Sequence, residues 1–234
     1  PFFAIFNIGQ SHESSIHKPK ERLRHDPAKM QLPPYHPDIP EMRHDWAYYY
    51  DNITAMDALV GRRLKELEKA GLAEETIVFY YSDHGGVIGR SKRFLYDSGT
   101  HVPLIIRFPK KYAHLAPGAP GMRTDRLVSF VDFAPTILSL AGIPRPEPMQ
   151  GEAFLGPHAV KPREYVYLFR SRMDERYDLA RAVRDKRYKY IRNFMPNLPW
   201  GQKISYLWRA PSMAAWHKAY LARPALRRWG EVLL

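Results

Sequence analysis

Apolar residues recur along the middle of the chain with the period of an α-helix. Successive members lie three or four positions apart and so share one helix face: Tyr49, Ile53, Met56, Val60, Leu64 and Leu67. Gly71 provides a stop, and residues 77–81 form a β-branched and aromatic run that ends at a glycine-containing loop. A helix, a short link, a buried strand and such a loop are typical of α/β proteins.

Other apolar runs predict further buried strands, at residues 2–7, 102–108 and 127–131. The last run leads into a short helix at residues 133–140, with Pro135 in its first turn and Gly142 beyond its end. Between the first strand and the long helix, residues 8–41 are polar and rich in proline. They predict a long loop, and long loops in compact domains are usually functional.

The pattern changes after a proline-rich linker at residues 143–162. Short apolar runs separated by tight turns then predict an antiparallel sheet, with strands at residues 165–170, 178–184 and 188–192. Residues 212–222 predict a final helix. We therefore expect two parts, an α/β domain in residues 1–161 and part of a small antiparallel subdomain in residues 162–234.

The composition indicates a folded, basic protein. Hydrophobic residues make up 45% of the chain and charged residues 26%, which allows a sizeable core and argues against disorder. The net charge of +12 favours anionic partners, among them nucleic acid, phosphate and sulfated or carboxylated glycans. We expect no nucleic-acid partner, because no nucleic-acid-binding motif is present, and no membrane span, because no apolar run approaches ~20 residues. The absence of cysteine excludes disulfides, thiolate metal sites and a cysteine nucleophile within these residues.

Two adjacent metal-capable side chains, Asp83 and His84, follow the strand at residues 77–81. Loops at the carboxyl ends of strands are where open α/β sheets keep their sites, and this pair could ligate a cation. The alternative is a simple turn, since aspartate and glycine are common in turns, and composition alone favours the turn.

Two further groups could act on an anion. Lys92 lies in a basic cluster with Arg90 and Arg93, which would attract sulfate or phosphate, although taken alone the cluster is better explained as a solvated basic loop. His12, just beyond the first apolar run, could donate a proton or bind an oxyanion, although a lone loop histidine is more often uninvolved.

The order of these features is much more specific than any one of them. A loop histidine is followed by a long helix, a strand, Ser-Asp-His-Gly at residues 82–85, a Lys-x-x-x-Tyr motif at residues 92–96 and Val-Pro-Leu-Ile at residues 102–105. Val-Asp-Phe-Ala-Pro-Thr-Ile-Leu follows at residues 131–138. From residue 1 to about residue 195, the chain closely resembles the sulfatases of the alkaline-phosphatase superfamily.

This resemblance implies an alkaline-phosphatase-like α/β/α sandwich with a mostly parallel sheet. Residues 1–161 would be the C-terminal part of the sulfatase catalytic domain, and residues 162–234 part of the C-terminal antiparallel subdomain. Within the family, residues 187–200 (Arg-Tyr-Lys-Tyr-Ile-Arg-Asn-Phe-Met-Pro-Asn-Leu-Pro-Trp) and residues 40–45 are most similar to heparan N-sulfatase (sulfamidase) and its bacterial relatives. Aryl sulfatases and other carbohydrate O-sulfatases stay open as alternatives.

The resemblance also assigns roles to the candidate residues. Asp83 and His84 match a pair of ligands to the divalent cation of sulfatases, which is usually calcium; because histidine is a less natural calcium ligand, manganese and zinc stay open. Lys92 matches the basic residue that contacts the substrate sulfate. His12 matches the histidine that contacts the sulfate and donates a proton to the leaving group. His12 and Lys92 are therefore the expected catalytic and substrate-binding residues.

The nucleophile of sulfatases is a formylglycine, made from the first residue of a Cys/Ser-x-Pro/Ala-x-Arg motif. This chain has no cysteine, and no serine stands in that pattern. A second pair of metal ligands, an N-terminal Asp-Asp, is also missing. We therefore expect a fragment that lacks the N-terminal formylglycine segment and is inactive alone.

The function implied for the complete enzyme is hydrolysis of a sulfate ester or sulfamate on a sulfated glycan, with a periplasmic or secreted location. Two alternatives come from other classes. The same superfamily contains phosphatases and phosphonate monoester hydrolases, and a non-catalytic anion-binding remnant would also retain these residues.

Overall fold

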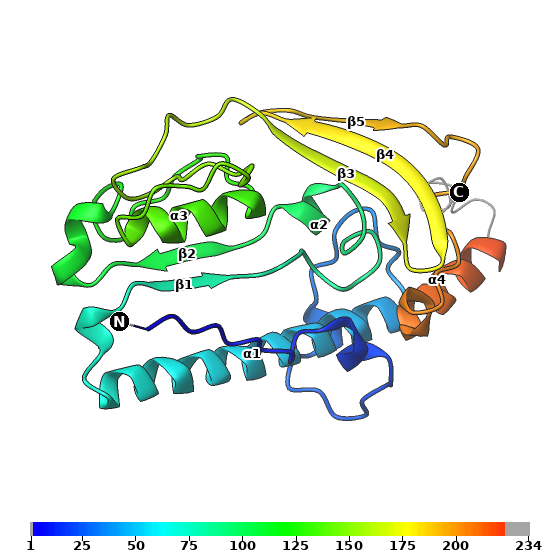
Figure 1. Cartoon of the computed structure of the whole chain (residues 1–234). Helices are drawn as coiled ribbons and strands as arrows, with labels where there is room; N and C mark the ends of the chain where they lie inside the picture. Colours follow the sequence, from blue (N-terminus) through cyan, green and yellow to red (C-terminus); the bar gives the residue numbers. More distant parts are fainter. Residues whose placement is uncertain (1, 223–234) are drawn as a thin grey trace.

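The long helix of the computed structural model is α1 (Pro40–Lys69), which lies along one side of the molecule (Figure 1). The structure describes residues 2–222. Pro40 at the start of the helix has no backbone N–H to leave unpaired and a φ suited to the helix. Past its end, Gly71 takes the left-handed conformation, with φ of +69°. The predicted helix is confirmed, and it begins earlier than the apolar pattern.

Two strands of the α/β part pair in the middle of the molecule, β1 (Val78–Tyr81) and β2 (Leu104–Arg107). The short helix α2 (Asp97–Thr100) lies between them in the sequence. The helix α3 (Phe133–Leu140) confirms the prediction for these residues and covers one face of the pair, with Phe133 4.9 Å from the Tyr81 ring. Figure 1 shows α1 on the opposite side, which gives helix, sheet and helix layers.

The two strands run antiparallel, with Val78 opposite Arg107 and Tyr81 opposite Leu104. The sequence predicts mostly parallel pairing, and no parallel pair occurs within residues 2–222. A buried apolar run has the same composition in either direction, so the chain direction is not contained in the pattern.

The predicted C-terminal antiparallel sheet is present, with strand order β3 (Val166–Met173), β4 (Arg176–Arg184) and β5 (Lys189–Asn193). The register places Leu168, Ala182 and Ile191 side by side, and this face packs against Leu95. The expected final helix is α4 (Pro211–Ala222). The division between residues 161 and 162 falls in the irregular segment before β3 and stays a prediction.

Two predicted strands are absent. Residues 2–7 form no strand, and Phe3 and Phe6 are 69% and 60% exposed. Residues 127–131 form no strand, and the run ends in the 3-10 helix Phe130–Asp132, which is capped by Ser129. The Ser129 backbone N–H donates to Asp132 Oδ2 at 3.0 Å, a local bond that competes with strand pairing.

The main core lies between α1, α4 and the loop that follows β1. Its fully buried members are apolar and come from all three segments, among them Met42, Ile88, Met213 and Trp216. A buried polar contact joins the two helices, where the Ser212 backbone N–H donates to Asp45 Oδ2 at 2.8 Å. Burial raises the pKa of Asp45 despite this bond. The core therefore holds the loop after β1 firmly in place.

Candidate active site

The loop of residues 82–93 begins where β1 ends and carries three of the four predicted site residues. Backbone bonds hold its first half against α2, from Gly85 N to Gly99 O at 3.0 Å and from Gly86 N to Ser98 O at 3.2 Å. Gly85 must be a glycine here, because a Cβ would collide with the Ser98 carbonyl oxygen. A bond from Lys92 N to Gly86 O at 2.9 Å closes the loop.

Asp83 and His84 lie side by side at the start of this loop. His84 Nε2 is 3.7 Å from Asp83 Oδ2, and the Asp83 side chain is 83% exposed. His84 Nδ1 is 2.8 Å from the Gly85 carbonyl oxygen, which can only accept, so Nδ1 carries the proton of that bond. In the neutral ring, a lone pair on Nε2 then faces the carboxylate.

This arrangement fits a shared cation. A ligating histidine usually donates its other N–H to a carbonyl or carboxylate, as His84 does to Gly85. Two donors bound to one metal at ordinary distances lie about 3 to 3.7 Å apart, which matches the observed separation. Two donors are only part of a coordination shell, and residues 2–222 contain no group of three or more His, Cys, Asp or Glu arranged to bind a metal.

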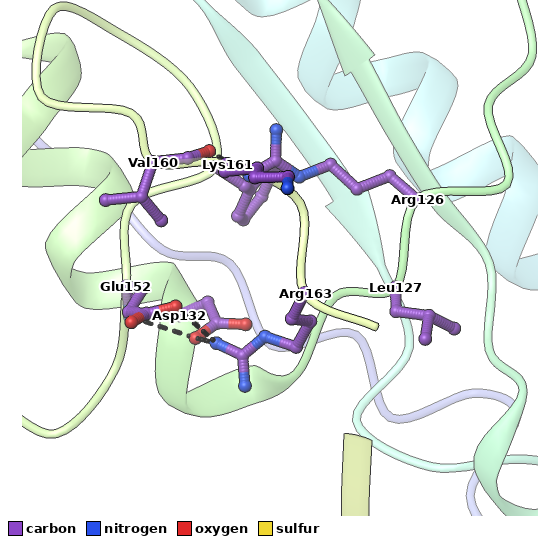
Figure 2. Close-up of a pocket in the computed structure, with 8 residues that line it drawn as sticks. Arg126, Leu127, Asp132, Glu152, Val160, Lys161 and Arg163 are labelled. Carbon is purple, nitrogen blue, oxygen red and sulfur yellow. Dashed lines mark hydrogen bonds and ion pairs between the residues drawn. The ribbon is translucent and has the colours of Figure 1, made fainter. Parts of the chain in front are cut away.

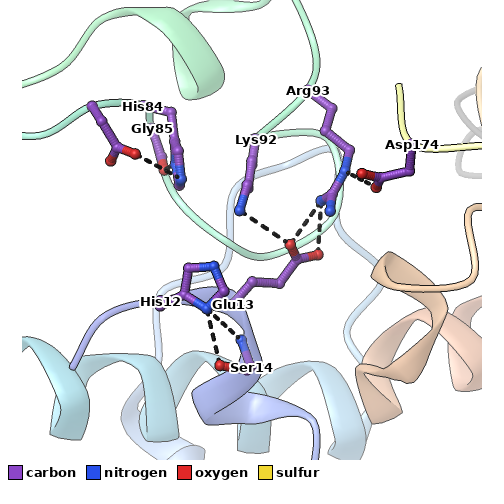
Figure 3. A network of polar contacts seen from close by, with 9 residues as sticks. His12, Glu13, Ser14, His84, Gly85, Lys92, Arg93 and Asp174 are labelled. Atoms are coloured by element: carbon purple, nitrogen blue, oxygen red, sulfur yellow. Dashed lines mark hydrogen bonds and ion pairs between the residues drawn. The ribbon is translucent and has the colours of Figure 1, made fainter. Parts of the chain in front are cut away.

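His12 lies across from this loop, at the start of the 3-10 helix Glu13–Ile16. Its Nδ1 accepts from the Ser14 backbone N–H at 3.3 Å and lies 2.9 Å from Ser14 Oγ. The neutral ring therefore carries its proton on Nε2. Figure 3 shows this nitrogen on the side of the ring that faces Lys92 and His84, so it is placed to donate toward the space between them.

Lys92 and His12 are brought together through a buried carboxylate, Glu13. Lys92 Nζ lies 3.5 Å from Glu13 Oε2, and Arg93 Nη1 lies 2.8 Å from each Glu13 oxygen. Arg93 Nε also pairs with Asp174 in the turn between β3 and β4, at 2.9 Å (Figure 3). Lys92 therefore contacts the residue that directly follows His12, although the two predicted anion-contacting residues are 80 positions apart in the sequence.

The backbone of the loop is in an uncommon conformation at two residues. Arg90 and Arg93 have φ of +70° and +80°, in the left-handed region that costs non-glycine residues energy. Arg90 is held by its ring contacts, 3.8 Å from the Tyr96 centroid and 4.4 Å from that of Tyr35. Such conformations cluster at functional sites, where the surroundings enforce them.

The sequence patterns did not single out Glu13 or Asp174. The signal for Glu13 was weak but present, since an acidic residue directly follows His12 and a second cation directly follows Lys92. Nothing in the local sequence of Asp174 links it to residues some 80 positions earlier.

A shallow cavity opens elsewhere on the molecule, between α3 and the segment before β3 (Figure 2). Arg163 Nη2 lies 2.5 Å from Asp132 Oδ1 and 3.7 Å from Glu152 Oε2 within it. Asp132 also accepts from the Glu152 backbone N–H at 3.0 Å. These contacts satisfy the buried Asp132 carboxylate and hold the segment before β3 in place. None of the four predicted site residues lines this cavity.

Comparison with known proteins identifies the family. Residues 1–143 match the Sulfatase family model, and residues 88–201 match the model described as N-sulphoglucosamine sulphohydrolase, C-terminal. The chain belongs to the sulfatase family. The resemblance seen in the sequence is thereby confirmed, including its likeness to sulfamidase. Sulfatases generally use a metal ion and a formylglycine.

Individual relatives agree with this assignment. An ulvan-active sulfatase of Formosa agariphila is 39% identical over 91% of this chain and 41% of its own length. Human arylsulfatase K is 33% identical over 52% of this chain and 24% of its own length. The chain therefore spans about two fifths or less of these curated relatives. The crystal structure of yidJ from Bacteroides fragilis, assigned to the sulfatases, matches 68% of this chain and 36% of that chain with a TM-score of 0.54 and 25% identity. The predicted alkaline-phosphatase-like fold class is confirmed.

Proposed function

We propose that this chain forms part of the active site of an enzyme that hydrolyses sulfate esters or sulfamates on an anionic glycan. The observation that supports the proposal is that Glu13, the neighbour of His12 in the sequence, contacts Lys92 of the loop that bears Asp83 and His84, so that His12 lies across from this loop (Figure 3). The names of two relatives support a carbohydrate substrate. One is the ulvan-active sulfatase, and the other is an N-acetylglucosamine-6-O-sulfatase of Bacteroides thetaiotaomicron, 38% identical over 44% of this chain and 18% of its own length.

The two predicted catalytic residues act on opposite ends of the bond that breaks. The Lys92 ammonium, whose side chain is 21% exposed, contacts a sulfate oxygen and stabilises the charge that grows on the sulfate group in the transition state. The His12 Nε2–H donates its proton to the departing oxygen or nitrogen. Glu13, which follows His12 in the chain and lies 3.5 Å from Lys92 Nζ, connects the anion site to the segment of the proton donor.

Asp83 and His84 would hold the divalent cation of the site. When bound, this cation supplies Lewis-acid stabilisation of the sulfate oxygens. We expect calcium, the usual cation of the family, with Asp83 as its oxygen ligand. Because His84 offers nitrogen, manganese and zinc are the competing ions, and metal analysis of the purified full-length protein distinguishes them.

The nucleophile is not among these residues, because the chain contains neither cysteine nor a serine in the formylglycine motif. The proposal therefore requires a formylglycine from another segment of the full-length protein. Because glycans of polymer size do not enter cells freely, we also propose a periplasmic or secreted location, which fractionation tests. No helix in the described part of the chain is long and apolar enough to cross a membrane.

The test compares the full-length protein on matched substrates, 4-nitrophenyl sulfate and 4-nitrophenyl phosphate, followed by O-sulfated and N-sulfated glucosamine. We expect release of sulfate and little release of phosphate. Lys92→Ala is expected to lower kcat more than it raises KM, since its contact strengthens in the transition state. Preferential release of phosphate, or no turnover of any sulfated compound, would contradict the proposal.

A further inference from the structure

Glu13 is the most completely buried charged group near the predicted active site. Its side chain has no solvent exposure, and its two oxygens contact only cationic side chains among the polar contacts in the described residues. Arg93 is also buried, with a side chain 5% exposed, and it contacts both oxygens at 2.8 Å. These are charge-assisted hydrogen bonds of full strength, so Arg93 satisfies the carboxylate.

Lys92 is held differently. Its Nζ lies 3.5 Å from Glu13 Oε2, beyond the range of a strong hydrogen bond, and its side chain keeps 21% of its surface in solvent. The attraction orients the ammonium but leaves its three N–H donors available to another anion. A tighter pair would compete with a substrate sulfate for the same donors.

The position of Glu13 in the chain gives this contact a second consequence. Glu13 directly follows His12 in the chain, and its side chain contacts Lys92 and Arg93 at the end of the loop. A single carboxylate therefore connects the segment of His12 to the side chain of Lys92. Displacements of about 1 Å in such a pair cost large factors in rate.

We propose that Glu13 is a positioning residue, which holds Lys92 in register with His12 for the sulfate group; this inference rests on the proposed sulfatase function. Glu13 touches neither substrate nor nucleophile in this role. It acts through Lys92, so substitution of Glu13 should lower kcat only in enzyme that retains Lys92.

The experiment is a double-mutant cycle in the full-length enzyme, using Glu13→Gln, Lys92→Ala and the combined variant. Turnover of 4-nitrophenyl sulfate and thermal unfolding are measured for each. We expect Glu13→Gln to lower kcat about 10- to 100-fold, the range for a catalytic group displaced by about 1 Å, with a smaller change in KM. In the Lys92→Ala background, the same substitution should leave kcat unchanged within about twofold while still lowering the melting temperature.

Asp174→Asn is the matched control, because it removes the second carboxylate of Arg93 at 2.9 Å without contacting Lys92. It should lower stability with little effect on kcat. If Glu13→Gln does not fold, Glu13→Asp keeps the buried charge but shortens its reach, and the same cycle is read from that variant.

The outcomes separate the two proposals. Wild-type enzyme that releases no sulfate would overturn the proposed function. Active wild-type enzyme in which the kcat loss of the Glu13 variant persists fully in the Lys92→Ala background would overturn the positioning role alone. The same holds if Asp174→Asn lowers kcat as much as Glu13→Gln does, because the effect would then come from folding.

Discussion

Asp51 on α1 holds the long polar loop against the helix, and its removal should release that loop. The Asp51 side chain is only 6% exposed. Its carboxylate accepts from the backbone N–H groups of Arg24 and His25, each at 3.0 Å, and lies 2.8 Å from His25 Nδ1. Lys20 Nζ lies 3.5 Å away. We therefore predict that Asp51→Asn loosens the segment around these residues, because an amide NH2 would replace one of the two oxygens that accept from backbone N–H groups.

The size of the effect follows from the pKa of Asp51. Burial by itself raises this pKa, but the hydrogen bonds from Arg24 and His25 outweigh it and lower the pKa from 3.8 to about 2. At about 1.36 kcal/mol per pH unit, the ionised carboxylate contributes about 2 kcal/mol to stability. Because the pKa is lowered on folding, this contribution is complete above pH 3.8 and is lost as the pH falls toward 2, with about half gone by pH 3.

The assay is hydrogen–deuterium exchange of residues 18–39 in the full-length protein, combined with urea unfolding at pH 7 and pH 3. Asp51→Asn should be about 2 kcal/mol less stable than wild type at pH 7 and about 1 kcal/mol less stable at pH 3. Asp57→Asn, an exposed carboxylate on the same helix, is the control. Equal stability of wild type and Asp51→Asn at pH 7, or a difference that does not change with pH, would refute the reasoning.

Three further predictions concern the site. Asp83→Ala should reduce bound divalent metal in the full-length protein by removing one donor, which elemental analysis after dialysis would show; unchanged metal content would contradict the assignment. His12→Ala should slow sulfated sugars about 10²- to 10⁴-fold but aryl sulfates less, because a nitrophenolate leaves without a proton; equal losses on both would count against proton donation. Gly85→Ala should cost about 1–3 kcal/mol in thermal unfolding, since its Cβ would collide with the Ser98 carbonyl oxygen. Gly86→Ala should be tolerated, because its Cβ would lie 3.5 Å from Ser91 Oγ, an ordinary contact distance.

Periodicity predicted the helices and the C-terminal sheet well because those patterns are local. The helix at residues 133–140 and the strands β3 to β5 follow directly from apolar spacing and turn residues. The pattern failed where an apolar run forms no strand pairing or where a polar side chain bonds to the nearby backbone. Residues 2–7 are extended but unpaired, and the bond between Ser129 and Asp132 turns residues 129–132.

For the site, motif order predicted which residues take part but not how they are held. Asp83 and His84 are adjacent in sequence, so their proximity needed no structure. The family resemblance predicted that His12 and Lys92 belong to one site. It did not predict the carboxylate that joins their segments. Glu13 and Arg93 are 80 positions apart, and a contact at that range leaves no local pattern for a sequence argument to use.

The contacts of residues 93–97 with the C-terminal sheet limit how the protein can be divided or recombined. Arg93 pairs with Asp174, and Asp97 pairs with Arg184 and Lys189, so both ends of this segment are bonded to the sheet across the irregular linker. Exchanging the sheet for that of a distant homologue would remove the Asp174 partner of the buried Arg93 and both cationic partners of Asp97. A working chimaera would therefore have to take residues 93–97 and the sheet from the same parent protein, although some seventy residues of sequence separate them.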